Sequence, residues 1–310
     1  MKLFSSILIA LIVLASTKVA PANARLDGFR NLLDLPYANS DHPRQTLNLY
    51  LPEHPVSKKI PLIAYIHGGA WRKGDKAFGV HRIRKFLRGG QFAAASIGYR
   101  LTDEGPWPLQ IHDCKAAIRW LKANADQYGY DASNIAVMGN SAGGHLVAML
   151  GVSADVPEMS GRLGLHLDMD TRVKCVVDFC GPANLLTMVD QPSTMRHDTP
   201  DSPEGQLVGG YVRKRSKVAL DASPQTHVSK ADAPILVVHG DKDPLVPVQQ
   251  ARDFHEALLK GKVDSTLVIL KGMGHGLRHP ELDRRIEAFF AKHLLGENVE
   301  ISGTPILTKQ

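Results

Sequence analysis

The residues with the clearest chemical meaning form a glycine-flanked serine motif, Gly139-Asn140-Ser141-Ala142-Gly143. An apolar, strand-like run at residues 135–138 comes directly before it, and a small, apolar, helix-like segment follows it. A strand, a sharp turn and a helix together hold a serine on a strained turn with its hydroxyl projecting, and glycines leave room for so tight a turn. We therefore predict that Ser141 is a nucleophile; the alternative is a plain glycine-rich turn.

A serine hydroxyl is a weak nucleophile until a base takes its proton. His275 lies in a glycine-rich stretch between the last predicted strand and the last predicted helix, and we predict that it is the general base. His279, its nearest competitor, directly precedes Pro280 at the start of that helix and lacks the flexible setting. Other histidines in or near the motifs are expected to be structural: His67, His112, His145 and His239.

Two aspartates compete for the role of the acid that orients this histidine. Asp241 and Asp243 both follow the predicted strand at residues 235–238. We choose Asp243, because it lies on the loop beyond the strand next to Pro244, whereas Asp241 is placed to cap the turn through the backbone. Serine, acid and histidine then occur in the chain order of one known type of hydrolytic triad.

A second glycine-rich stretch, His67-Gly68-Gly69-Ala70-Trp71, follows the predicted strand at residues 60–66. Backbone N–H groups without side chains in the way can approach a reacting carbonyl and stabilise its oxyanion. We expect the amides of Gly68, Gly69 and Ala142 to form this oxyanion hole; a tight structural turn is the alternative. Trp71 is predicted to contact the substrate as a pocket wall, and packing under the loop is the alternative.

The elements that must position these residues alternate along the chain. From residue 45 onward, apolar β-rich runs alternate with helical patterns, which predicts an α/β fold whose mostly parallel sheet is covered by helices on both faces. The expected strands are residues 46–51, 60–66, 92–97, 135–138, 173–179, 235–238 and 265–270, and the expected helices are residues 112–125, 141–150 and 281–295.

One long stretch, residues 184–233, departs from this alternation and is rich in proline, glycine, serine and charge. A structureless loop of that length is unusual inside a compact domain. We therefore expect an insertion with its own helices, placed over the site as a cap; a peripheral decoration without a binding role is the alternative. Residues 296–310 are expected to be an exposed, loosely held end.

The first 24 residues have the features of a signal peptide: Lys2, an apolar run at residues 7–15, and Ala22-Asn23-Ala24. We expect cleavage near Ala24, export to the periplasm or the medium, and a single domain over residues 25–310. A membrane anchor is the alternative, but the apolar run is shorter than the ~20 residues that a spanning helix needs. No stable membrane anchor is therefore expected.

Composition argues against other classes of function. The formal net charge of +6 is spread along the 310 residues, and its densest cluster, residues 213–215, is short, so we expect no nucleic-acid partner. The three cysteines, Cys114, Cys175 and Cys180, are expected to be buried apolar side chains and not a metal pair, with a disulfide to Cys114 left open.

Six motifs in order resemble the α/β-hydrolase superfamily, in particular the feruloyl and acetyl xylan esterase group (BD-FAE-like) and hormone-sensitive-lipase-like esterases. They are HGGAW at 67–71, DCKAAIRWL at 113–121, GNSAGGHL at 139–146, ASPQTHV at 222–228, HGDKDPLVP at 239–247 and GHG at 274–276. The resemblance covers most of residues 37–295. Ala70 replaces the third glycine usual in lipase-like relatives, and Asn140 replaces the commoner His or Asp, so the lipase branch matches less closely.

This resemblance implies an α/β-hydrolase fold and hydrolysis of carboxylic esters through an acyl-enzyme on Ser141, with no cofactor. Together with export, it implies acetyl or feruloyl esters of a plant polysaccharide, or similar short acyl esters, as substrates. A peptidase related to prolyl oligopeptidase and an aryl formamidase stay open as alternatives. A non-catalytic binding protein on the same fold is less expected, because all three triad residue types are present.

Overall fold

The computed structural model describes residues 25–308. The expected signal peptide, residues 1–24, and the last two residues lie outside the described residues. Between residues 25 and 308, no helix combines the length and the apolar character that a membrane crossing requires.

The described chain forms one nine-stranded sheet in the order β1-β2-β4-β3-β5-β6-β7-β8-β9. β1–β2 and β2–β4 pair antiparallel, and every other pair is parallel. This confirms the predicted α/β fold with a mostly parallel sheet. The strands are β1 (Phe29–Pro36), β2 (Thr46–Pro52), β3 (Ile60–Ile66), β4 (Ala93–Ile97), β5 (Tyr130–Asn140), β6 (Cys175–Phe179), β7 (Ile235–Gly240), β8 (Ser265–Lys271) and β9 (Ile306–Leu307).

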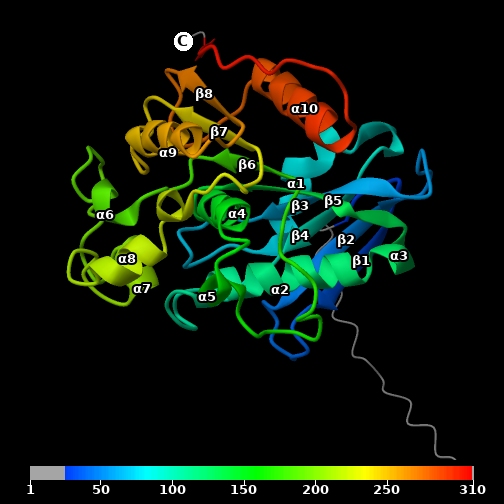
Figure 1. The fold of residues 1–310 in the computed structure, drawn as a ribbon, viewed down its shortest axis with the longest axis horizontal. Coiled ribbons are helices and arrows are strands. Elements are labelled where there is room, and N and C mark those ends of the chain that lie inside the picture. Colours follow the sequence, from blue (N-terminus) through cyan, green and yellow to red (C-terminus); the bar gives the residue numbers. More distant parts are fainter. Residues whose placement is uncertain (1–24, 309–310) are drawn as a thin grey trace, which may run out of the picture.

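Helices cover both faces of the sheet, which is why the central strands are continuous apolar runs; every residue of β3 and β7 is buried. On one face, α2 (Leu109–Ala123), α4 (Ala142–Val152) and α9 (Gln249–Lys260) enclose the larger core, and α2 and α4 lie across the sheet in Figure 1. On the other face, α1 (Gly79–Ile83) and α10 (Pro280–Leu294) enclose a second core. Short helices α3 (Ala125–Tyr128) and α5 (Pro157–Ser160) flank α2.

The expected insertion at residues 184–233 contains short helices: α6 (Leu185–Met188), α7 (Pro203–Val208), α8 (Ser216–Asp221) and a 3-10 turn at Pro224–His227. It is tied to loops that follow the sheet strands. The Trp107 N–H donates to the Leu207 carbonyl (2.7 Å), and the Thr194 N–H donates to the Pro244 carbonyl (2.9 Å). The Arg72 guanidinium donates to the Asp201 carbonyl (3.1 Å). A role as a cap over the site stays a prediction.

The three cysteines are buried and free, so the disulfide left open by the sequence is not formed.

The C-terminal end is mostly exposed, as expected, but the expectation that it is loosely held is wrong. β9 pairs parallel with the end of β8, opposite Leu270 and Lys271, and Ile306 is only 4% exposed. The segment before β9 is held by Arg285 on α10, whose Nη1 donates to the carbonyls of Ser302 (2.9 Å) and Thr304 (2.5 Å). A two-residue strand is too short to show a periodic pattern, so the sequence gives no signal for it.

We expect Arg285→Gln to lower the free energy of unfolding by about 2 kcal/mol, because the substitution removes hydrogen bonds that carbonyls of the C-terminal segment accept. Urea unfolding followed by fluorescence measures this change, and limited trypsin digestion reports release of the segment. Arg284→Gln is the matched control, since exposed Arg284 pairs with the same Glu281 and makes no hydrogen bond to the C-terminal segment within residues 25–308. Equal losses in both variants would contradict the assignment.

Candidate active site

Ser141 occupies a strained turn between β5 and α4, with φ 55° and ψ −123°. Its N–H donates to the Phe179 carbonyl (2.7 Å), which ties the turn to β6. A Cβ added to Gly139 would lie 2.4 Å from the Gly143 oxygen, and one added to Gly143 would lie 2.1 Å from the Ile66 oxygen. The flanking glycines are therefore required by close backbone approach, and the serine lies on the predicted strand–turn–helix.

The structure brings Asp243 and His275 together: His275 Nδ1 lies 2.7 Å from Asp243 Oδ2. Since the carboxylate is the acceptor, the proton of this hydrogen bond lies on Nδ1. Nε2 is then the ring nitrogen that can accept a proton from a nucleophile. The other carboxylate oxygen, Oδ1, accepts the N–H groups of Leu245 (2.9 Å) and Val246 (3.1 Å). This is the geometry of a histidine oriented by a fixed acid.

The charge of Asp243 is held by its hydrogen bonds. Burial alone would raise the pKa of this carboxyl group, but hydrogen bonds from His239, His275 and the Leu245 N–H outweigh burial and hold the pKa well below its usual range. Asp243 is therefore ionised at any pH near neutrality, as the orienting acid of a triad must be.

Asp241, the competing acid, has a different place. Its Oδ1 accepts the Gly272 N–H (2.7 Å), and its Oδ2 lies 3.3 Å from Lys271 Nζ. It therefore links the ends of β7 and β8, which differs from the cap of its own turn that the sequence predicted.

Four other histidines of the sequence motifs and loops fit structural roles: His279, His112, His67 and His145. His279 caps α10, since its Nδ1 accepts the Glu281 N–H (3.1 Å). His112 Nε2 pairs with the Glu158 carbonyl (3.0 Å). Burial lowers the pKa of both His67 and His145 to about 4, so these two are neutral.

The predicted oxyanion donors lie on the two turns that meet at Ser141. A Cβ on Gly68 would come within 2.5 Å of the Asn140 oxygen, so the glycine loop passes directly beside the serine motif. Ala142 is the first residue of α4, where an N–H has no intrahelical acceptor. Within residues 25–308, no hydrogen bond uses the N–H of Gly68 or Gly69. The role of the Gly68, Gly69 and Ala142 amides as an oxyanion hole stays a prediction.

The structure corrects the prediction for Trp71. Its side chain is 1% exposed, and its Nε1–H donates to His145 Nδ1 (3.2 Å) inside the core. Ala70 and Trp71 both have positive φ, 57° and 56°, so the turn sends the indole beneath the loop and not towards a substrate. A motif shows that an aromatic residue is present, but it does not show the direction of its side chain.

Sequence reasoning missed one residue that supports this loop. Tyr99 is fully buried, stacks on the His67 ring at 4.3 Å between centroids, and donates its hydroxyl proton to the His67 carbonyl (2.9 Å). It thereby fixes the chain immediately before Gly68. No local pattern marks Tyr99, because the contact joins segments 32 residues apart.

A small cavity of about 60 Å³ lies beside the candidate base. It is lined by polar and apolar side chains in similar measure: Tyr65, Arg82, Lys85, Met138, Asn140, Phe179, His275, Leu277 and Leu282, with Gly276.

The chain is similar to known esterases in sequence and in structure. The BD-FAE family model matches residues 47–258. Esterase LipC of Mycobacterium tuberculosis is 34% identical over 237 residues, which are 76% of this chain and 58% of that protein. The chain thus spans little more than half the length of this curated relative.

Two solved structures are also similar. A truncated carbohydrate esterase from gut microbiota is 30% identical, with a TM-score of 0.81, and the match covers 87% of this chain and 98% of that one. A bifunctional GH43-CE protein of Bacteroides eggerthii is 30% identical, with a TM-score of 0.79, covering 85% of this chain and 38% of that one.

The choice between the two aspartates can be tested directly. We expect Asp243→Asn to lower kcat for an ester substrate by roughly 10⁴-fold, because an amide in its place favours the wrong histidine tautomer. Asp241→Asn is the matched control and should stay within about threefold of the parent, since Asp241 only links two strand ends. Steady-state kinetics on p-nitrophenyl acetate measure both, and the reverse ranking would overturn the assignment.

Proposed function

Because the chain belongs to the BD-FAE family of α/β-hydrolase esterases, we propose that it hydrolyses carboxylic esters through an acyl-enzyme on Ser141. The observation that carries this proposal is the 2.7 Å hydrogen bond from His275 to the ionised Asp243, formed at the same sheet edge as the strained Ser141 turn. This combination provides a projecting hydroxyl and an oriented base, which are the two parts that nucleophilic acyl transfer needs.

In the proposed reaction, Ser141 Oγ attacks the ester carbonyl carbon while its proton passes to His275 Nε2. The carbonyl oxygen becomes an oxyanion, which accepts hydrogen bonds from the amides of Gly68, Gly69 and Ala142. The carbon–oxygen bond to the alcohol then breaks, and His275 returns the proton to the leaving oxygen. Water activated by the same base releases the acid and regenerates Ser141.

Acetyl or feruloyl esters, or similar short acyl esters, are the substrates that we assign to this site. The similarity to a carbohydrate esterase over nearly its whole length supports a saccharide, such as a plant polysaccharide, as the alcohol part of the ester.

We expect residues 25–310 to hydrolyse p-nitrophenyl acetate and p-nitrophenyl butyrate, because a serine activated by a base attacks short activated acyl esters. Ser141→Ala should lower kcat by roughly 10⁴-fold or more. Release of the nitrophenolate gives the rates, and an unchanged melting temperature shows that the variant is folded. Equal rates from the parent and the variant would refute the esterase, whereas cleavage of a peptide anilide or of formylkynurenine alone would favour the alternative hydrolases.

We also propose that the protein is exported and cleaved near Ala24, on the strength of the charged, apolar and small-residue regions in residues 1–24. Expression of the full chain in a Gram-negative host, followed by mass spectrometry of each fraction, measures this. A periplasmic or secreted species that begins at Arg25 is expected. Intact chain confined to the cytosol would contradict export.

A further inference from the structure

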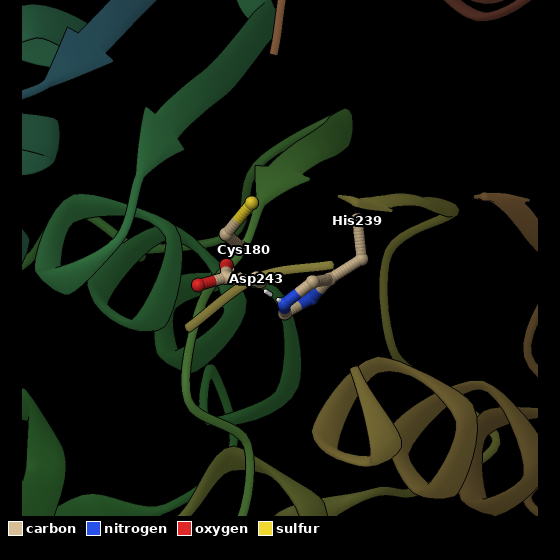
Figure 2. A group of neighbouring side chains, drawn as sticks. All are labelled: Cys180, His239 and Asp243. Atoms are coloured by element: carbon tan, nitrogen blue, oxygen red, sulfur yellow. Dashed lines mark ion pairs between the residues drawn. The ribbon is translucent and has the colours of Figure 1, made fainter. Parts of the chain in front are cut away.

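The carboxylate of Asp243 has a second histidine partner besides His275. His239, near the end of β7, is 1% exposed, and its Nε2 lies 3.1 Å from Asp243 Oδ2. Figure 2 shows this contact, with Cys180 on the strand end beside it. The same Oδ2 accepts the proton on His275 Nδ1 (2.7 Å). One carboxylate oxygen is thus shared between a buried histidine and the candidate base.

The contacts fix the proton position on His239. Nε2 faces two acceptors, Asp243 Oδ2 and the Val246 carbonyl at 2.9 Å, so Nε2 must carry a proton that the two acceptors share. Nδ1 is buried and has no hydrogen-bond partner among the described residues. The geometry therefore selects the neutral tautomer with the proton on Nε2.

We propose that His239 is a positioning residue, whose Nε2–H holds the Asp243 carboxylate in the orientation that serves His275 and draws charge away from Oδ2. The inference rests on the proposed esterase function. His239 would set how rigidly His275 is held and how strongly Asp243 favours the protonated form of His275. It touches neither the substrate nor the reacting atoms.

The other titratable groups around His239 are Asp178 and Cys180, from β6 and the residue after it. Asp178 is 1% exposed, its Oδ1 accepts the Gly181 N–H (2.9 Å), and burial raises its pKa to about 6. Burial, with the nearby charge of Asp243, raises the pKa of the Cys180 thiol, which stays neutral.

The cluster of Cys180, His239 and Asp243 has ligand atoms within 4.8 Å of one another, as a metal site would. The Asp243 oxygens, however, already accept four N–H groups, two on each oxygen. The donor set fits a hydrogen-bond network better than metal ligation.

Two substitutions separate the hydrogen bond from simple packing. His239→Leu keeps much of the volume and removes the donor, whereas His239→Gln keeps an N–H group at a similar reach. For the leucine variant we expect kcat on p-nitrophenyl acetate to fall roughly 10- to 100-fold with KM within about twofold, as for loss of a residue that orients a functional histidine. The glutamine variant should retain kcat within about threefold.

The pH profile supplies a readout that packing alone would not move. Without the His239 donor, Asp243 Oδ2 holds more negative charge and favours protonated His275, so the acidic limb of kcat/KM should move to higher pH by about half a unit or more in His239→Leu. The limb of His239→Gln should match the parent. A folded leucine variant with parental kcat and an unmoved limb would overturn the proposal.

A measurement on the unaltered protein keeps the inference testable if the leucine variant does not fold. Long-range ¹H–¹⁵N NMR of the histidine side chains should show His239 as the Nε2–H tautomer throughout the active pH range, and the Nδ1–H tautomer would overturn the proposal. If the proposed esterase function is wrong, the parent protein will show no hydrolysis that depends on Ser141. The NMR tautomer of His239 tests its contact with Asp243 in either case.

Discussion

A single buried charge, the Asp243 carboxylate, constrains the edge of the sheet at which the candidate site is built. A carboxylate removed from water costs several kcal/mol unless hydrogen bonds replace its hydration. Here the donors come from the end of β7, from the loop that follows it, and from the loop after β8. These segments must therefore keep one relative arrangement, and that arrangement places His275.

The turns around Ser141, in contrast, depend on backbone strain. Ala70, Trp71, Ser141 and Cys180 have positive φ although none is glycine, and such residues typically cost about 1–3 kcal/mol each. All four lie just beyond the carboxyl ends of β3, β5 or β6, where the two apolar cores on either face of the sheet hold the strands rigidly. The strand order also changes direction here, since β3 lies between β4 and β5, and parallel sheets bind ligands at such switch points.

The buried Asp243 carboxylate and the strained Ser141 turn are the features on which the proposed ester hydrolysis rests. Membership of the BD-FAE family accounts for the shared motifs. The insertion at residues 184–233 contacts the loop after β3 and the loop after β7, so it borders both halves of the site.

The sequence by itself determined the fold class and the ranking of the main candidates, because continuous apolar runs and the Ser141 motif are local patterns that reflect burial and turn geometry. It ranked Asp243 above Asp241, but only the tertiary structure set one carboxylate on His275 and the other on the Gly272 amide. The buried direction of Trp71, the pairing of Ile306 and the contact of His239 with Asp243 were also decided in three dimensions. Each depends on which distant segments pack together, and a local pattern does not encode that packing.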